Sequence, residues 1–320
     1  MKSLLVGLVV LGLGGPANAR TPAGALQSSL VRTVRQYNQQ LRRGQPAMDL
    51  GLVFRLVGRT LERTGGDQLA ARRMAVRVAR WSAGRNSRGA RPLSPQVVRA
   101  LRVAWQLHRR QVRKGTSIPY VSHLLSVAGI VMRSGGSEPE IIAALLHDAV
   151  EDQGGARTLR LVRRRFGRRV ARTVEEVSEP RGAWRWRKQH TIDSIRAGRM
   201  APSGLRVKLA DALHNGGTMT RGARRDGDAF WSVFSGKKAG TLWYLDGMLA
   251  GFRTATAGAP ELRGLTDRLQ RQVERLHRAA GTQPRSTRQY PTPQQRKAGG
   301  RYAVSNNGNA RGVHALHDGV

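Results

Sequence analysis

Two pairs of polar residues lie close together in one short stretch of the chain. The first is the histidine–acid pair His147-Asp148, and the second is the pair of acids Glu151-Asp152. They end an apolar run that begins at Ile141, which predicts a helix with its polar groups gathered at one end. Positions four apart share a helix face, so Glu151 would lie one turn beyond His147 and Asp152 one turn beyond Asp148. Because buried acids and histidines are costly unless something binds them, the stretch predicts a site for a cation and for proton transfer.

A divalent cation at this stretch would need further ligands from elsewhere in the chain. His123 and Asp211 are the candidates, because each lies within an apolar helical run. Imidazole nitrogen and carboxylate oxygen suit Mn, Fe, Zn or Mg and need no thiol. The chain has no cysteine, which excludes disulfides, a thiolate metal site and a cysteine nucleophile.

The order His123, His147-Asp148 and Asp211 resembles the HD-domain superfamily of metal-dependent phosphohydrolases. Over about residues 98 to 278 the sequence is most similar to the hydrolase domain of RelA/SpoT enzymes and to their small stand-alone relatives. The motifs that carry this resemblance are Arg113-Lys114-Gly115, Pro119-Tyr120, Leu146 to Asp152, Phe166-Gly167, Lys208 to Asp211 and His214-Asn215. The resemblance implies one divalent metal, expected to be Mn²⁺, held by His123, His147, Asp148 and Asp211.

The same resemblance implies roles for residues around the metal. Two acids would orient water and move protons as catalytic residues, namely Glu151 and Asp152. Substrate binding is assigned to Arg113 against the guanine base, Lys114 near it, Asn215 near the ribose, and Arg187 and Lys188 near the phosphates. A solvated basic turn explains Arg187 and Lys188 equally well. His108 and His214 are interpreted as packing residues or as neighbours of the ligands.

The chain departs from the family pattern at three places. Ala212 stands where the family commonly has a basic residue, and Leu124 stands where it commonly has proline. Gly216-Gly217 replaces a more helical continuation after Asn215. The missing basic residue bears on the choice of nucleotide more than on catalysis, because every expected ligand and both acids are present.

The charge of the chain allows a second class of function. Its 56 Lys and Arg against 20 Asp and Glu give a net charge of +36, which is typical of proteins with nucleic-acid or anionic membrane partners. The basic residues are spread along the chain rather than gathered in one arm. A solvated basic surface is therefore favoured over a dedicated nucleic-acid site, although such a field would attract a polyphosphate substrate.

Every element that the apolar periodicity predicts is helical, and no alternating strand pattern competes. Helices are expected at residues 26–41, 48–61, 68–81, from Ser94-Pro95 to Gly115, 121–133, through His147 to Gly154, 158–165, 168–177, after 184, 205–213, 240–252 and 260–278. Short Gly or Pro breaks join them, so the fold class is all-α, a helical bundle. The family resemblance implies that this bundle is an HD domain.

Composition, pattern and the family resemblance together divide the chain into four segments. Residues 1 to 19 resemble a secretory signal peptide, and their apolar run is too short to span a bilayer. Residues 20 to 95 form a basic extension and linker, either helical or disordered, residues 96 to 278 the HD hydrolase domain, and residues 279 to 320 a disordered tail. The leader predicts export, whereas a guanosine polyphosphate substrate favours the cytoplasm. A start codon assigned upstream in error would reconcile the two.

Two function classes therefore stay open. The first is a metal-dependent phosphohydrolase like guanosine-3′,5′-bis(diphosphate) 3′-pyrophosphohydrolase, with another nucleotide or phosphoester as the alternative substrate. The second is a basic nucleic-acid-binding protein with a vestigial HD core. Intact Glu151 and Asp152 favour the enzyme, because a purely binding role would not need these acids.

Overall fold

A computed structural model describes residues 21–82 and 91–284 of the chain. Within these ranges every regular element is a helix and no strand is present beyond one isolated bridge, so the predicted all-α bundle is confirmed. The signal-peptide-like segment 1–19, most of the predicted linker, and the predicted tail from residue 285 onward lie outside the described residues. Among the described helices, none combines the length and the apolar character needed to cross a bilayer.

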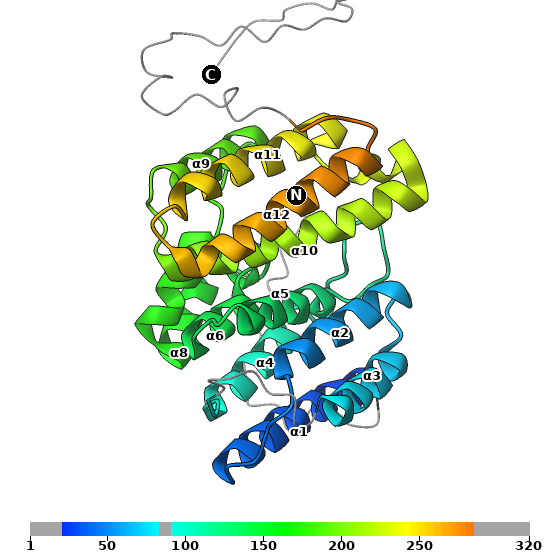
Figure 1. Cartoon of the computed structure of the whole chain (residues 1–320), viewed down its shortest axis with the longest axis vertical. Coiled ribbons are helices and arrows are strands. Elements are labelled where there is room, and N and C mark those ends of the chain that lie inside the picture. Colours follow the sequence, from blue (N-terminus) through cyan, green and yellow to red (C-terminus); the bar gives the residue numbers. More distant parts are fainter. Residues whose placement is uncertain (1–20, 83–90, 285–320) are drawn as a thin grey trace, which may run out of the picture.

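The helices stack in layers along the long axis of the molecule (Figure 1). One end holds α1 (Pro22–Arg42), α3 (Gln68–Trp81) and α4 (Pro95–Leu107). The middle holds α2 (Leu50–Arg63), α5 (Val121–Arg133), α6 (Glu138–Leu146), α7 (Ala149–Asp152) and α8 (Gly155–Val177). The other end holds α9 (Trp184–Arg196), α10 (Pro202–Asp226), the 3-10 helix η1 (Gly227–Val233), α11 (Lys237–Ala255) and α12 (Pro260–Ala279).

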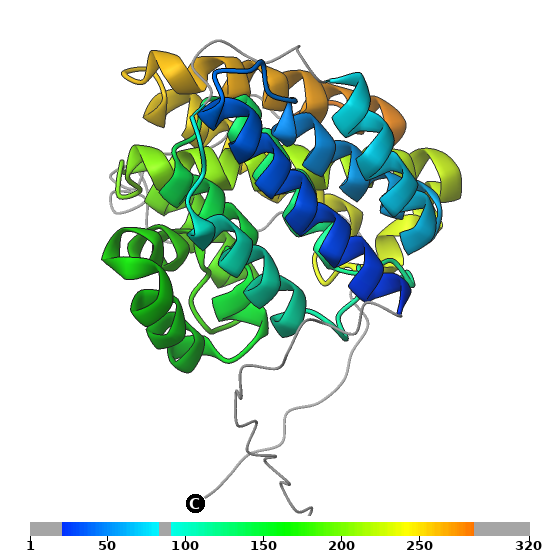
Figure 2. The ribbon, with the colours of Figure 1, turned by 90° about the horizontal axis from the view of Figure 1, so that it is seen from below.

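The N-terminal extension forms three helices between residues 22 and 81, and side-chain caps explain where they begin. Thr21 Oγ1 accepts a hydrogen bond from the Gly24 N–H at 3.1 Å, and Asp49 Oδ1 accepts one from Leu52 at 2.8 Å. Such caps satisfy the backbone donors that a helix start leaves unpaired. In Figure 2 the extension lies directly against the rest of the bundle, with α1 and α3 running across it.

Glycines let α2 of the extension approach α5 closely. A Cβ on Gly58 would lie 2.3 Å from Ser126 Oγ and 2.4 Å from the Ser122 carbonyl oxygen. Facing it from α5, a Cβ on Gly129 would lie 2.6 Å from the Gly51 carbonyl oxygen. Real Cβ atoms do not approach other atoms this closely, so the backbones can pack at this separation only because these residues lack side chains.

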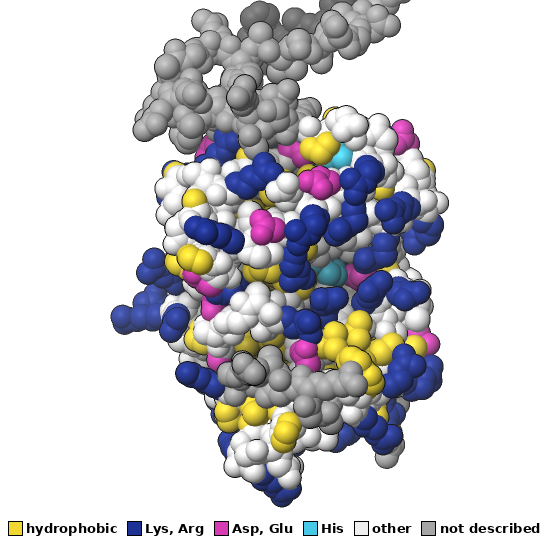
Figure 3. Space-filling model, in the orientation of Figure 1, with side chains coloured by type: hydrophobic (Ala, Val, Ile, Leu, Met, Phe, Trp, Pro, Cys, Tyr) yellow, Lys and Arg dark blue, Asp and Glu magenta, His cyan; other side chains and the backbone are white. Residues whose placement is uncertain are grey.

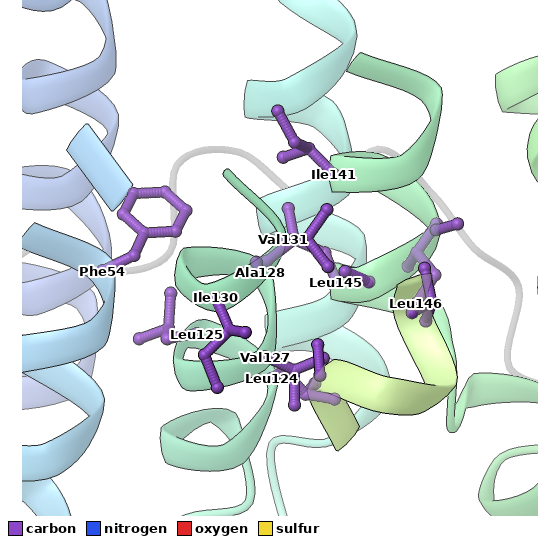
Figure 4. Packing of buried hydrophobic residues seen from close by; sticks show 14 of the residues in the cluster. Phe54, Leu124, Leu125, Val127, Ala128, Ile130, Val131, Ile141, Leu145 and Leu146 are labelled. Carbon is purple, nitrogen blue, oxygen red and sulfur yellow. The ribbon is translucent and has the colours of Figure 1, made fainter. Parts of the chain in front are cut away.

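Large apolar side chains complete the contact around α5. Figure 4 shows Phe54 reaching from α2 toward Leu125 and Ile130 of α5, while Val131 faces the side of α6 on which Ile141 lies. All five side chains are buried. Because α5 is enclosed from Val121 to Val131, the core fixes the position of its third residue, His123.

Several predicted helices differ from the structure in their ends. The helix that begins at Pro95 ends at Leu107 rather than near Gly115, because His108 leaves helical geometry. The helix around Asp211 is longer than predicted and runs through Gly216-Gly217 to Asp226. A single α8 covers the two helices predicted on either side of Phe166-Gly167, but Gly167 kinks it with φ 86° and ψ 172°.

The prediction of one continuous helix through His147 is wrong. α6 ends at Leu146, His147 and Asp148 form a turn, and α7 resumes at Ala149. Asp148 has φ −90° and ψ −4°, outside the regular helical range. The two polar pairs therefore do not stack on one helix face as the spacing predicts. Because of the turn, the Asp148 carboxylate lies next to the imidazole of His147 instead.

Candidate active site

Four predicted ligands meet where the buried helices α5 and α10 pass the α6–α7 turn. His123 Nε2 lies 3.3 Å from both Asp148 Oδ2 and Asp211 Oδ1. His147 Nε2 lies 3.0 Å from Asp148 Oδ2 and 3.8 Å from Asp211 Oδ1. The ligand atoms of His123, His147 and Asp148 all lie within 4.8 Å of one another, and Asp211 approaches this group from α10.

Hydrogen bonds on the far side of each imidazole fix which nitrogen faces the site. His147 Nδ1 lies 2.9 Å from the Ala144 carbonyl oxygen, so it carries the proton. His123 Nδ1 lies 2.7 Å from His214 Nδ1. Because Nδ1 of each ring has a hydrogen-bond partner outside the site, Nε2 of each ring can direct a lone pair toward the space between the four ligands. The two Nε2 atoms are 3.2 Å apart there.

The arrangement fits a divalent cation. Ligand atoms about 2.1 Å from a shared tetrahedral or octahedral ion lie roughly 3.0 to 3.4 Å apart, close to most of the separations found here. Burial disfavours the charged form of His147, but the facing Asp148 and Asp211 carboxylates outweigh it and raise the pKa of this imidazole well above its usual value. The same contacts hold the pKa of Asp148 and of Asp211 well below the usual range, against the effect of burial. The site therefore attracts positive charge.

Tyr120 holds the Asp148 carboxylate from the other side. Its hydroxyl donates to Asp148 Oδ2 at 2.7 Å, and burial together with this carboxylate raises the pKa of Tyr120. His108 stacks on the Tyr120 ring at a centroid distance of 5.3 Å and contacts Gln111 Oε1 through Nδ1 at 2.6 Å. His108 is thus a packing residue beside the site, as the sequence indicates.

Glu151 and Asp152 face the cavity next to these ligands. Glu151 Oε1 accepts the Glu179 N–H at 2.7 Å, and Asp152 Oδ2 accepts the Gln111 side-chain amide at 2.7 Å. Solvent reaches Glu151, yet the cavity walls surround its carboxylate. This partial burial raises the pKa of Glu151 to about 7, with Lys208 opposing the shift and the Asp148 carboxylate adding to it. A carboxyl group with this pKa can take up or release a proton at neutral pH.

Arg113 and Asn215 form a chain that ends on a ligand. The Arg113 guanidinium donates to Asn215 Oδ1 at 2.7 Å, and the Asn215 amide donates to Asp211 Oδ1 at 2.6 Å. Arg113 also lies over the Tyr120 ring, 5.5 Å from its centroid. The structure thus brings together Arg113 and Asn215, which lie far apart in the sequence.

Arg187 and Lys188 also line the cavity, but both side chains form ion pairs with Glu179. Glu179 accepts hydrogen bonds from Arg187 at 3.1 Å, from Lys188 at 2.5 Å and from the Tyr244 hydroxyl at 3.1 Å. Burial raises the pKa of Glu179, but Lys208 and Lys188 outweigh it and leave the pKa below its usual value. The predicted pair is therefore part of a buried charge network rather than a solvated turn.

These side chains line one cavity of about 440 Å³, within the range of small-molecule sites. Lys114 lies on its wall, and Ala212 lies beside Asp211, with Arg221 and Arg225 farther along α10. On the molecular face shown in Figure 3, Lys and Arg side chains are scattered among neutral ones rather than gathered into one stripe. The cavity itself is lined by Lys and Arg side chains and by Asp and Glu side chains in nearly equal number.

Several residues of the site were missed at the sequence level. Tyr120 and Lys208 lie within motifs that carry the family resemblance, so their positions could have identified them. Lys208 is buried, donates to the Val177 carbonyl at 3.0 Å and lies 3.8 Å from Asp211 Oδ2. Glu179 and Glu62 give no local signal, because only the fold brings them to the cavity.

The Gly216-Gly217 departure has a structural reason at its first position. A Cβ on Gly216 would lie 3.1 Å from Gln272 Cγ of α12. Gln272 Nε2 donates to the Gly216 carbonyl at 3.2 Å and to Thr220 Oγ1 at 2.7 Å. Glycine here lets α12 lie close to the helix that carries Asp211, without ending that helix.

Comparisons with known proteins agree with this site. Residues 100–237 match the HD domain family. A probable GTP pyrophosphokinase of Mycobacterium leprae is 34% identical over 180 residues, which are 47% of this chain and 21% of that protein. A probable guanosine-3′,5′-bis(diphosphate) 3′-pyrophosphohydrolase of Synechocystis is 34% identical over 124 residues, which are 37% of this chain and 16% of that protein. The chain thus spans only a small part of the length of these relatives.

A solved structure described as a metazoan ortholog of SpoT that hydrolyses ppGpp is also similar. It is 25% identical, with a TM-score of 0.47, and the match covers 57% of this chain and 98% of that one. The matched residues 100–237 include all four convergent ligands as well as Glu151 and Asp152. Residues 100–237 of the chain therefore match an HD domain, and this region is similar to RelA/SpoT-type proteins.

Proposed function

We propose that this protein is a Mn²⁺-dependent hydrolase that removes pyrophosphate from the 3′ position of guanosine tetra- or pentaphosphate. The observation that carries the proposal is the convergence of His123, His147, Asp148 and Asp211 beside Glu151 in a cavity whose walls also carry Lys and Arg side chains. Two curated relatives with moderate identity are named for this reaction. The mixed nitrogen and oxygen donors suit Mn²⁺, since they include no thiolate.

The residues around the ligands supply positioning and proton transfer. A bound divalent cation would neutralise phosphate charge and lower the pKa of a nearby water. Glu151, with a pKa of about 7, accepts the proton that water loses as it attacks phosphorus. The bond from phosphorus to the 3′ oxygen then breaks, and that oxygen takes up a proton, which balances the proton that Glu151 accepted. Asp152, on the same cavity wall, helps to orient the water. Pyrophosphate leaves and a 3′-hydroxyl remains.

The basic groups of the cavity bind the substrate in this proposal. Arg113 and Lys114 lie against the base, Asn215 near the ribose, and Arg187 and Lys188 near the phosphates. Arg187 and Lys188 are paired with Glu179, so phosphate oxygens would compete with a carboxylate for them. Ala212, at a position that is commonly basic in the family, favours a second candidate, a related nucleotide with different base or phosphate contacts.

One assay separates these substrates. Purified protein with Mn²⁺ is offered guanosine tetraphosphate, guanosine pentaphosphate, their adenosine counterparts and a small phosphoester. Released pyrophosphate is measured for the nucleotides and released phosphate for the phosphoester. Fast release from the guanosine compounds alone supports the proposal. Comparable release from the adenosine compounds would support the second candidate, and no release from any of them would remove the enzymatic proposal.

The metal is tested independently of turnover. His147→Ala should abolish tightly bound metal and with it the rise in melting temperature on adding Mn²⁺, because a ligand that binds only the folded state stabilises it. Elemental analysis and thermal melting measure both effects. Equal metal in the wild-type and variant proteins would contradict the assigned ligand set.

We also propose that the protein acts in the cytoplasm, where the proposed nucleotide is found. The signal-peptide-like residues 1–19 predict the opposite. Mass spectrometry of the native N-terminus distinguishes the two. A mature chain that begins at Arg20 would mean export and would exclude a cytosolic nucleotide as the substrate.

A further inference from the structure

Glu62 brings a carboxylate to the metal site from outside the matched HD domain. It lies in the last turn of α2, whereas the family match begins at residue 100. Its side chain is only 5% exposed, and its two oxygens have different partners. Oε1 lies 2.8 Å from His214 Nε2, and Oε2 lies 2.5 Å from Arg221 Nη2. A buried carboxylate with such partners is ionised, and although burial raises its pKa, His214 and Arg221 lower it to about 2.

A line of contacts leads from Glu62 to a metal ligand. His214 Nδ1 lies 2.7 Å from His123 Nδ1, and His123 Nε2 faces the carboxylates of the site. The Glu62–His214 contact is close, but its angle falls outside ideal hydrogen-bond geometry. A nitrogen lone pair at 2.8 Å from a carboxylate oxygen would be repelled, so the proton of neutral His214 lies on Nε2. His214 Nδ1 is then an acceptor, and His123 Nδ1 donates to it.

We propose that Glu62 is a positioning residue for the metal, acting through His214 to hold the Nε2 lone pair of His123 toward the site. The inference rests on the metal site of the proposed function. A carboxylate that fixes the far nitrogen of a ligating histidine sets its tautomer, its ring orientation and its basicity. Here one additional imidazole lies between the carboxylate and the ligand. The metal-binding unit consequently extends into the N-terminal helices.

The packing of α2 explains how a distant residue can do this. Gly58, one turn before Glu62, lies against Ser122 and Ser126 of α5, on either side of His123 in sequence. α2 is therefore held against the helix that carries the ligand. If α2 packed less closely against α5, the position of the Glu62 carboxylate would vary, and the ring of His214 would lose its fixed orientation.

The chain offers a matched control for a test. Asp246 of α11 and His277 of α12 form a second buried carboxylate–imidazole contact, with Oδ1 and Nε2 2.9 Å apart. The far nitrogen of His277 faces Thr282 Oγ1 at 2.9 Å, not a metal ligand. Asp246→Asn therefore makes the same kind of chemical change as Glu62→Gln, with a similar effect expected on folding but none on the metal.

The experiment measures the affinity of the full chain for Mn²⁺ alone, by competition with a chelating dye, for wild type, Glu62→Gln and Asp246→Asn. Melting temperatures of the metal-free proteins record the cost to folding. Glu62→Gln should weaken Mn²⁺ binding by roughly 10- to 100-fold, as outer partners of metal ligands do. Asp246→Asn should leave the affinity unchanged. Equal affinity of Glu62→Gln and wild type would overturn the inference, and failure of wild type to bind Mn²⁺ would overturn the proposed function as well.

A second variant tests the route through His214. In a His214→Leu background the contact from Glu62 to His123 is interrupted, so Glu62→Gln should cause no further loss of Mn²⁺ affinity. Such non-additivity is the signature of residues that act through one another. An equal loss from Glu62→Gln in both backgrounds would mean that Glu62 acts through the general packing of α2, and the proposed role would be wrong.

Discussion

The Arg113 guanidinium donates a hydrogen bond from Nη2 to Oδ1 of Asn215, and the two atoms are 2.7 Å apart. The amide of Asn215 in turn donates to Asp211 Oδ1 at 2.6 Å. One amide therefore stands between a group assigned to the nucleotide base and a group assigned to the metal. This arrangement orders the arginine before substrate arrives, which lowers the entropic cost of binding.

Arg113→Ala should weaken binding of the nucleotide and spare the chemistry. A hydrogen bond to a charged group contributes about 1.5 to 3 kcal/mol, so the KM for guanosine tetraphosphate should rise roughly 10- to 100-fold. A small phosphoester lacks the base, and its hydrolysis should not change. Arg110→Ala is the control, because Arg110 is exposed and does not line the cavity. A similar rise in KM for both variants would point to the general basic field instead.

Changing Glu151 and Asp152 together to Gln and Asn should separate metal binding from turnover. The four ligands stay in place, so the metal content should equal that of wild type. Turnover should fall by roughly 10² to 10⁴, the range for losing general acid–base catalysis. Single-turnover kinetics and elemental analysis measure the two quantities on the same preparation. Turnover at the wild-type rate would remove both acids from the mechanism.

Much of this site could be predicted from the sequence, for a physical reason. Ligands such as His123 and Asp211 lie in apolar helical runs, where a polar side chain must have a partner. Helix 121–133 was predicted with the boundaries found, because its apolar residues are continuous and Gly135 follows it with φ 75°. Local sequence thus identified the helices and the polar residues that they carry.

Features that depend on tertiary packing could not be predicted. The turn at His147-Asp148 follows from contacts with Tyr120 and His123, which local apolar periodicity does not encode. The N-terminal extension gave no functional signal, since its contribution is one carboxylate, Glu62, among charged residues on an amphipathic helix. The close approach of α2 to α5, which the local sequence does not reveal, brings this acid to the site.

The pH dependence should reflect Glu151. If its carboxylate accepts the proton from water, kcat/KM for the nucleotide should rise with pH and level off above the pKa of about 7. Burial causes this raised pKa, against the opposing charge of Lys208. In the Glu151→Gln variant, the residual kcat/KM should no longer rise with pH over this range. A wild-type profile that is flat between pH 6 and pH 8 would exclude Glu151 as the base.

The same pKa has a consequence for stability that can be measured without substrate. Because the pKa of Glu151 is raised from 4.5 to about 7 on folding, the folded state holds its proton more tightly than the unfolded state. In the metal-free wild type, this group should therefore contribute progressively less to stability as the pH rises from 4.5 through 7. Glu151→Gln lacks this loss, so its melting temperature relative to wild type should increase over that interval. A difference that does not vary with pH would contradict the raised pKa.

Gly58 should be far less tolerant of alanine than another helical glycine. At position 58 of α2 the new Cβ would lie 2.3 Å from Ser126 Oγ and 2.4 Å from the backbone oxygen of Ser122, and a backbone atom cannot move aside cheaply. Gly58→Ala should lower the free energy of unfolding by about 1 to 3 kcal/mol, the usual cost of overpacking. It should also weaken Mn²⁺ binding, since α2 carries Glu62 to His214.

Gly264 of α12 is the matched control for this change. It is exposed, and a Cβ there would meet no atom within 4 Å. Gly264→Ala should raise the free energy of unfolding by roughly 0.5 to 1 kcal/mol, because alanine restricts the unfolded chain and favours the helix. It should leave Mn²⁺ affinity unchanged. Denaturant unfolding and metal titration of both variants measure these effects. If Gly58→Ala matched Gly264→Ala in both, α2 would not be held against α5 as tightly as the structure has it, and the link from the extension to the metal ligand would lose its support.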